Sequence, residues 1–321
     1  MNAAIITAAG KTPVYGTFHK PEAANGMEVI DVRASALSQF SRSRSSGLHY
    51  SSDGIFPAVA GADGVGYTAD GRRVYFVLPE APFGALAERC LVRSERCVTV
   101  PHGLDDATAA AIANPGMSAW AALVERAHLH PGETVLVNGA TGSAGRLAVQ
   151  LARFLGAGKV IATGRNEAEL QQLLSLGADI VIPFAPEAFH SKQYEQALQR
   201  ELSHGINVVV DYLWGESAKT VIVAIAKAVE DATPVRFVHV GGSSGEENID
   251  LPGAALRSSA IQLMGSGIKS VPMPRLLEAI RRVFEAAVPA ELQIATRVVA
   301  LSEIAQYWDA PGKPRIVVTI P

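Results

Sequence analysis

The apolar residues of the chain follow two different patterns in two regions. Up to about Leu104, short apolar runs such as Val29–Val32, Val74–Leu78 and Cys90–Val92 alternate with glycine, proline and polar residues, which is typical of an all-β domain. From Thr134 onward, short continuous apolar runs alternate with segments of helical period. Strands in a parallel sheet that is covered on both faces have such runs. The pattern therefore predicts an α/β fold with a β domain and a doubly wound parallel sheet.

Six strands and two crossover helices are predicted in the second region. The first helix has an apolar stripe that ends at Leu155, with Arg146, Gln150 and Arg153 facing away, and the second helix spans Glu167–Leu176 before Gly177. The expected strands are Thr134–Asn138, Lys159–Thr163, Ile180–Pro183, Asn207–Tyr212, Val235–Val240 and Ile261–Met264.

The end of the chain is expected to return to the β domain. Pro272–Val288 is predicted as a helix, and Thr296–Leu301 and Arg315–Ile320 are predicted as strands. The predicted boundaries therefore place residues 1–115 and 270–321 in the β domain and residues 116–269 in the parallel-sheet domain.

A glycine-rich turn joins the first parallel strand to its helix. It is read as Ala140-x-Gly142-x-x-Gly145, a variant of the dinucleotide fingerprint with alanine in the first position. Such a turn brings backbone N–H groups and a helix N-terminus against a pyrophosphate. The residues predicted to bind it are Ala140, Thr141, Gly142, Ser143, Ala144 and Gly145.

The end of the second strand indicates which nucleotide binds. An NAD site normally has an acidic residue there that accepts hydrogen bonds from the ribose, but this chain has Gly164-Arg165-Asn166. A guanidinium attracts a 2′-phosphate, so these three residues favour NADP(H) as the cofactor.

Charge, hydropathy and cysteine content exclude several classes of ligand and of structural support. The 321 residues carry a net charge of −3, which provides no basic field for a nucleic acid or an anionic membrane. The longest apolar stretch is too short to span a bilayer, and the first residues lack the pattern of a secretory signal. Two cysteines cannot form a disulfide framework or a four-cysteine zinc lobe. We expect a cytoplasmic protein.

The order of these segments resembles a known family. A β domain followed by GATGSAG, KVIATGRN, LGADIVI, VVVDYLWG and IQLMGSG is similar to the medium-chain dehydrogenase/reductase superfamily, in its zinc-free quinone oxidoreductase (zeta-crystallin-like) branch. The resemblance implies a GroES-like β domain and a six-stranded Rossmann domain. It also implies a homodimer joined through the strand near Ile261–Met264.

The same resemblance places the metal ligands of zinc-dependent members on residues that do not bind zinc. The matching positions are Ser38, Ser41, Gly61-Ala62-Asp63 and Asn114. We therefore expect no metal. Hydride transfer without zinc requires an acceptor that is already electrophilic, such as a quinone or an α,β-unsaturated carbonyl.

Further site residues are carried over from the family. Ser38, Ser41 and Tyr50 lie in the stretch that lines the active site, with Tyr50 the candidate that hydrogen-bonds a carbonyl oxygen. Ser118 corresponds to a hydroxyl at the nicotinamide end. The loops after the fifth and sixth strands correspond to Val240, Gly241, Gly242, Gly265 and Ser266. A family tyrosine near the 2′-phosphate is Phe184 in this chain, and a family lysine is replaced in the run Glu167-Ala168-Glu169.

These observations predict an NADPH-dependent quinone oxidoreductase, with two alternatives. The first is an enal or enone reductase that uses NADPH. The second is a protein that binds NADPH as a sensor, or binds RNA through Arg42 and Arg44, without turnover. His128-x-His130 lies beside Pro131-Gly132 and is interpreted as a solvated loop instead of a metal site.

Overall fold

The computed structural model describes all residues except 48–51, 53 and 186–191. The chain forms two compact units. The first, unit 1, contains Met1–Asn114, Ile280–Val288 and Ile294–Pro321, and the second, unit 2, contains Pro115–Ala279 and Pro289–Gln293.

Helix α8 (Met273–Ala287) is divided between the two units, whereas the sequence places the boundary at residue 270. Its first part packs in unit 2, where Leu276 lies in a small apolar cluster with Ala121 and Val271. Its second part belongs to unit 1, where the rings of Phe284 and Tyr75 meet edge to face at 5.9 Å. The predicted and observed boundaries differ because α8 contributes side chains to the apolar cores of both units.

Unit 2 contains a parallel six-stranded sheet with the strand order β11-β10-β9-β12-β13-β14. This is the order of a doubly wound Rossmann sheet, so the predicted fold class is confirmed. Each observed strand lies within one residue of its predicted bounds. The strands are β9 (Thr134–Asn138), β10 (Lys159–Gly164), β11 (Ile180–Pro183), β12 (Val208–Asp211), β13 (Pro234–His239) and β14 (Ala260–Gly265).

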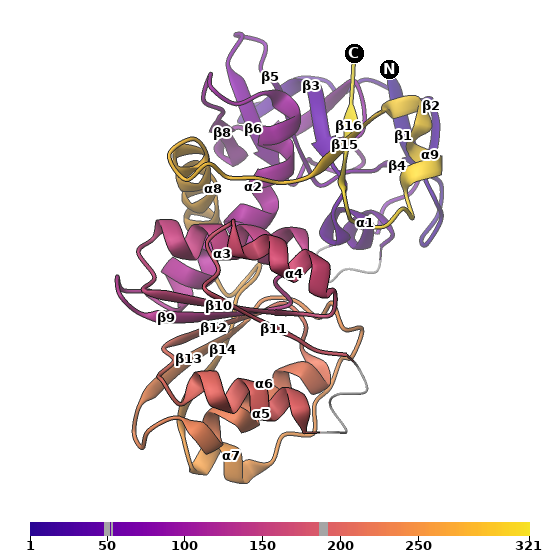
Figure 1. The fold of residues 1–321 in the computed structure, drawn as a ribbon. Coiled ribbons are helices and arrows are strands. Elements are labelled where there is room, and N and C mark those ends of the chain that lie inside the picture. The colour runs from indigo at the N-terminus through magenta and orange to yellow at the C-terminus, as the bar shows by residue number, and fades with distance from the viewer. Residues whose placement is uncertain (48–51, 53, 186–191) are drawn as a thin grey trace. The chain divides into compact units, whose positions relative to one another are not determined.

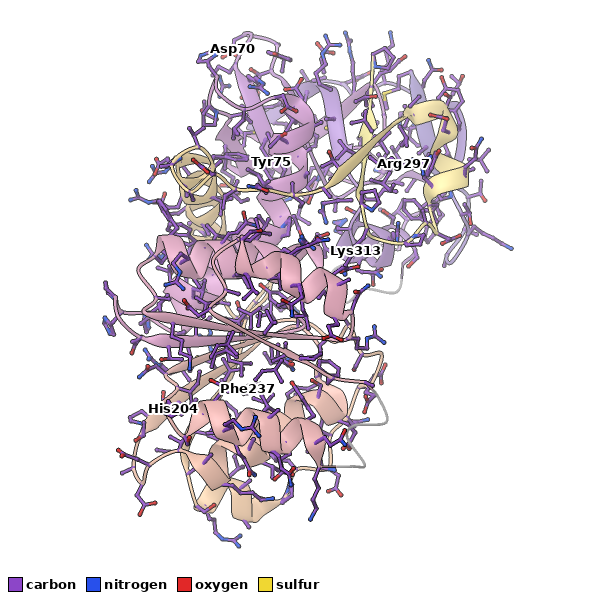
Figure 2. All side chains as sticks on the ribbon, in the orientation of Figure 1. Asp70, Tyr75, His204, Phe237, Arg297 and Lys313 are labelled. Atoms are coloured by element: carbon purple, nitrogen blue, oxygen red, sulfur yellow. The ribbon has the colours of Figure 1, made fainter. Side chains whose placement is uncertain are left out.

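Helices cover both faces of this sheet (Figure 1). On one face lie α3 (Ser143–Phe154) and α4 (Glu167–Leu174), and on the other lie α5 (Gln193–Leu202) and α6 (Gly215–Ala228). A short helix, α7 (Gly253–Arg257), packs against α6. Fully buried Phe237, labelled in Figure 2, belongs to the apolar core between the sheet and α5 and α6.

Gln150 lies off the apolar stripe of α3, as the helical period predicts, but it is buried. Gln150 is 5% exposed, and its amide donates to the Gln293 carbonyl at 3.0 Å and accepts from the Gln293 N–H at 2.7 Å. A polar residue on the outer side of α3 is therefore buried because a later segment of the chain covers it.

Unit 1 contains two sheets. The larger has the order β15-β16-β3-β5-β6-β8 with β7 paired to β3, and the smaller has the order β2-β1-β4. The strands are β1 (Asn2–Ile6), β2 (Val14–Thr17), β3 (Met27–Ala36), β4 (Ala58–Val59), β5 (Asp63–Tyr67), β6 (Arg73–Val77), β7 (Arg89–Arg93), β8 (Cys97–Thr99), β15 (Thr296–Ala300) and β16 (Arg315–Thr319).

The C-terminal strands belong to the sheet of the N-terminal region, as the sequence predicts. β16 pairs with β15 in parallel and with β3 antiparallel. Unit 1 also contains three short helical segments, namely η1 (Ser94–Arg96), η4 (Leu301–Glu303) and α9 (Ile304–Tyr307).

Helices α1 and α2 are among the helices of the structure that the sequence analysis does not predict. The Ser-Arg tract that contains Arg42 and Arg44 forms α1 (Gln39–Ser45), and the Ser38 hydroxyl accepts from the Ser41 N–H and caps the helix. Helix α2 (Asp106–Trp120) continues through Pro115 into a wider π-type turn, η2 (Ala121–Arg126). Among the helices of the described residues, none has the length and hydropathy of a membrane span.

Candidate functional site

The turn between β9 and α3 has the geometry that its glycines predict. Gly139 has φ +84°, a left-handed conformation that favours glycine. A Cβ on Gly145 would lie 2.5 Å from the Gly139 carbonyl oxygen and 2.7 Å from the Ala140 Cα. The Ala140 N–H donates to the Thr163 carbonyl at 2.8 Å, which joins the turn to β10. Two of the three glycines are therefore required by the fold of the turn itself.

Gly142 is different, because nothing in the chain requires a glycine there. A Cβ would meet only the Gly139 carbonyl oxygen, at an ordinary 3.6 Å, and the residue has φ −68°. Gly142 is the N-cap of the 12-residue helix α3, and as a glycine it has no side chain to hydrogen-bond the first N–H groups of the helix. The space beside Gly142 thus fits an anion at a helix N-terminus, and the pyrophosphate of a dinucleotide is such a group.

Arg165 follows β10 and is exposed. It forms no hydrogen bond or ion pair with any residue that the structure describes. The preceding Gly164 packs on the fingerprint turn, since a Cβ there would lie 2.9 Å from the Thr141 Cγ2. Arg165 therefore follows directly after a residue that packs on the turn, and its charge is not paired with any described residue. Asn166 has a structural role, because its side chain accepts from the Glu169 N–H at 3.1 Å and caps α4.

A buried polar network joins the carboxyl ends of the central strands. Asp211, fully buried at the end of β12, accepts from the Asn138 amide at 2.8 Å and contacts His239 Nδ1 at 2.9 Å. Asn138 in turn accepts from Thr163 and Ser217. The pattern of strands in the sequence indicates where Asp211 lies but gives no signal for His239. Only its position directly before Val240-Gly241-Gly242 could have drawn attention to it.

The predicted residues of the last two loops lie at the same edge of the sheet. The Val240 and Gly241 N–H groups donate to the Asp211 carbonyl, and the Ser266 N–H donates to the His239 carbonyl at 2.8 Å. At Gly241 a Cβ would approach nothing closer than 3.7 Å, and at Gly265 nothing lies within 4 Å. These loops therefore have open space above the carboxyl ends of β13 and β14.

Ser118, on α2, lies beside Tyr212, the residue that follows β12. Burial raises the pKa of the Tyr212 phenol, and the neighbouring Ser118 hydroxyl lowers it in part. The two groups are close without forming a hydrogen bond of good geometry, because the buried Tyr212 hydroxyl has no partner among the described residues. The structure thus brings Ser118 together with the loop after β12.

The remaining predicted residues lie in unit 1, except that Tyr50 falls outside the described residues. The Ser38 hydroxyl is engaged in the cap of α1, and the fully buried Ser41 hydroxyl has no hydrogen-bond partner among the described residues. Among those residues, no three His, Cys, Asp or Glu side chains gather as metal ligands, and His128 and His130 are exposed.

Asp63, at one of the family's metal positions, lies in a buried cluster with Tyr75, Asn114 and Arg315. Burial raises the pKa of the Asp63 carboxyl to about 6, and the charge of Arg315 followed by Tyr75 and Asn114 limits the rise. The contacts are too long or too oblique for hydrogen bonds, since neither carboxylate oxygen has a partner among the described residues. Burial likewise lowers the pKa of Arg315, which Asp63 partly restores.

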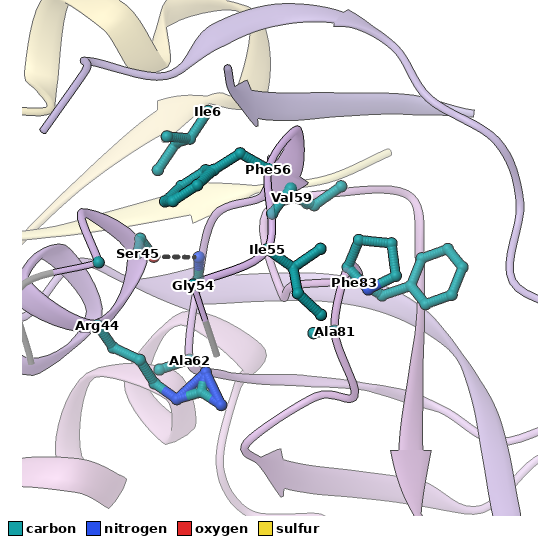
Figure 3. Close-up of a pocket in the computed structure, with 14 residues that line it drawn as sticks. Ile6, Arg44, Ser45, Gly54, Ile55, Phe56, Val59, Ala62, Ala81 and Phe83 are labelled. Carbon is teal, nitrogen blue, oxygen red and sulfur yellow. Dashed lines mark hydrogen bonds between the residues drawn. The ribbon is translucent and has the colours of Figure 1, made fainter. Parts of the chain in front are cut away.

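A cavity of about 50 Å³ lies beside α1 in unit 1 (Figure 3). Arg44 and Ser45 line it together with apolar side chains that include Phe56, and the Ser45 hydroxyl accepts from the Gly61 N–H at 3.1 Å. Arg42 donates to the Ala310 carbonyl. Both arginines are partly buried against unit 1 and do not form the exposed basic patch that RNA binding requires.

The chain is similar in sequence to known dehydrogenases and reductases. A family model described as zinc-binding dehydrogenase matches residues 144–283. Over 363 aligned residues that cover both chains fully, the chain is 26% identical to the probable NADPH-dependent quinone reductase tdiC of Emericella nidulans. It is 31% identical to the 2-methylene-furan-3-one reductase of Solanum lycopersicum, over 70% of this chain and 61% of that protein.

The fold is that of a solved quinone oxidoreductase from Thermus thermophilus, whose structure was also determined with NADPH. The TM-score is 0.79 at 24% identity, with full coverage of both chains. The chain belongs to the medium-chain dehydrogenase/reductase superfamily. Within that superfamily it falls in the quinone oxidoreductase branch.

Proposed function

We propose that this protein is an NADPH-dependent oxidoreductase that reduces a quinone or another electrophilic carbonyl without zinc. The observation that supports this proposal combines two features at one edge of the sheet. Beside Gly142 there is open space for an anion, here called the anion cradle. At the end of β10, the exposed guanidinium of Arg165 has no partner among the described residues. An acidic residue at the end of β10 would repel a 2′-phosphate, whereas arginine binds one through charge-assisted hydrogen bonds.

Different segments at the carboxyl ends of the parallel strands bind different parts of NADPH. When bound, NADPH supplies the hydride. The turn from Ala140 to Gly145 holds the pyrophosphate, and Arg165 holds the 2′-phosphate. The loops at Val240–Gly242 and Gly265–Ser266, with Ser118, hold the nicotinamide end. The chain thereby positions a reactive cofactor against an acceptor that needs no metal to be electrophilic.

The substitution Arg165→Ala tests the phosphate contact. Loss of a charge-assisted hydrogen bond lowers kcat/KM for NADPH by about 10- to 100-fold and leaves that for NADH within about twofold. Arg200→Ala, which removes an exposed arginine from α5, is the matched control for net charge. Steady-state rates with benzoquinone provide the measurement. An equal effect of Arg165→Ala on NADPH and NADH would contradict the assignment of the 2′-phosphate to Arg165.

The second candidate is reduction of the carbon–carbon double bond of an enal or enone, which the similarity to the 2-methylene-furan-3-one reductase favours. The two activities are separated by kcat/KM values for benzoquinone and for a straight-chain enal under the same conditions. Tight NADPH binding without turnover of either acceptor would support a sensor instead. The partly buried Arg42 and Arg44 give little support to RNA binding.

A further inference from the structure

Trp214 has a backbone conformation that is almost restricted to glycine. It lies in the turn between β12 and α6, with φ +63° and ψ −157°. The turn holds it there, since its N–H donates to Asp211 at 3.1 Å and its indole N–H donates to the Glu247 carbonyl at 3.2 Å. Strained residues of this kind cluster at active sites and ligand-binding segments.

His239 packs on this indole. The two rings are tilted by 42° with centroids 4.4 Å apart, and the His239 Nδ1 lies 2.9 Å from a carboxylate oxygen of Asp211. A carboxylate only accepts hydrogen bonds, so Nδ1 donates in this pair, and in the neutral tautomer that this bond selects Nε2 is an acceptor. The side chain is 35% exposed, and Nε2 has no hydrogen-bond partner among the residues that the structure describes.

The cluster of Asp211, Trp214 and His239 is attached to the fingerprint turn. Leu213 packs against Gly139 so closely that a Cβ there would lie 2.8 Å from the Leu213 Cγ. The cluster lies at the ends of β12 and β13, on the opposite side of β9 from β10 and Arg165. A dinucleotide with its 2′-phosphate at Arg165 and its pyrophosphate at Gly142 therefore extends its other half toward His239 and Trp214.

We propose that the His239 Nε2 accepts a hydrogen bond from a ribose hydroxyl of the nicotinamide half of the dinucleotide, while the Trp214 indole forms the adjacent wall of that subsite. Asp211 acts as a positioning residue, because it selects the tautomer and orientation of the imidazole. This inference rests on the proposed function, since it takes the ligand to be a dinucleotide. It adds two side chains, Trp214 and His239, to the binding site.

Two substitutions of His239 separate ligand binding from support of the turn. In His239→Asn the amide nitrogen reaches the place of Nδ1, which keeps the contact with Asp211 and removes the outer nitrogen. In His239→Gln the amide reaches the place of Nε2, which keeps an outer polar atom and gives up the contact with Asp211. Asp211 keeps its bonds from Asn138 and Trp214 in both variants.

Titration calorimetry with NADPH, reduced nicotinamide mononucleotide and 2′,5′-ADP measures the effect on each half of the ligand. We expect His239→Asn to bind NADPH and the mononucleotide about tenfold more weakly and 2′,5′-ADP unchanged, and His239→Gln to recover most of the loss. Wild-type affinity in His239→Asn would overturn the inference, whatever His239→Gln does. An equal loss for 2′,5′-ADP would also overturn it.

The controls distinguish this inference from the proposed function. His204, labelled in Figure 2, is an exposed histidine after α5, and His204→Asn removes the same ring elsewhere in unit 2 without an expected change in affinity. If the wild-type protein binds neither NADPH nor 2′,5′-ADP, the proposed function fails. If it binds both, and both His239 variants bind as the wild type does, only the role of His239 fails.

Discussion

Individual glycines of the fingerprint turn have different reasons for being glycine. Gly139 and Gly145 are required by the backbone, through a positive φ and through close approach of α3 to the turn. Gly142 has neither constraint, and we propose that its lack of a side chain leaves room for the bound cofactor. The sequence motif contains Gly142 and Gly145 but not Gly139, and the structure distinguishes the crowded backbone at Gly145 from the open space at Gly142.

The pair Gly142→Ala and Gly145→Ala tests this division. The first should leave the free energy of unfolding within about 0.5 kcal/mol of the wild type and weaken NADPH binding about tenfold or more, because its Cβ projects into the anion cradle. The second should destabilise the protein by about 1–3 kcal/mol, because its Cβ overlaps backbone atoms. Urea unfolding and calorimetry provide the measurements. Gly142→Ala with unaltered NADPH affinity would contradict the location of the cradle.

Asp63 gives a pH dependence to the stability of unit 1. Its folded pKa of about 6 lies above its ordinary value of 3.8, so the folded state binds the proton more tightly. The resulting stabilisation is complete below pH 4 and is lost as the pH rises through 6. The free energy of unfolding of the wild type relative to Asp63→Asn should therefore fall by about 2 kcal/mol between pH 4 and pH 7. A difference that is independent of pH would show that Asp63 keeps an ordinary pKa.

At the scale of elements, the parallel strands are the best predicted part because each is a continuous apolar run. The errors lie where tertiary contacts override the local pattern. α1 is formed from a Ser-Arg tract whose arginines face unit 1, and α2 continues through Asn114-Pro115-Gly116, which looks like a break. Gln150 has a solvent-facing position in the helical period of α3, and no local pattern reveals that residues 289–293 cover it.

The bonds of Gln150 join α3 to that later segment and should contribute to stability. Gln150→Ala leaves the N–H and the carbonyl of Gln293 without their partner, which costs about 1–3 kcal/mol of the free energy of unfolding. Gln196→Ala, an exposed position on α5, is the matched control and should change little. Urea unfolding measures both. Equal effects of the two substitutions would mean that water replaces the lost bonds at Gln293.

At the scale of the whole molecule, the sequence predicts the two-part architecture and the order of the Rossmann strands, since strand–helix alternation leaves few topologies open. It does not predict the division within α8, because a helix that serves two cores has one continuous apolar stripe. Among the candidate site residues, the fingerprint turn and Arg165, which we propose bind the phosphates, follow from local motifs. Trp214 and His239 lie far apart in the sequence and meet only through the sheet.

We propose that the molecule is a homodimer joined through β14. This strand is the edge of the six-stranded sheet, and Leu263 on it is 42% exposed. An exposed apolar edge strand is a ready template for pairing with a second copy. Light scattering after size exclusion should give the mass of a dimer for the wild type and of a monomer for Leu263→Lys. A wild-type monomer would refute this assembly.

The central claim is that the protein uses NADPH for zinc-free reduction of an electrophilic acceptor. The most direct measurement is the rate at which the purified protein, treated with a chelator, oxidises NADPH and NADH in the presence of benzoquinone. We expect turnover with NADPH that survives chelation and a kcat/KM for NADPH at least about tenfold above that for NADH. Equal use of NADPH and NADH, or loss of turnover on chelation, would contradict it.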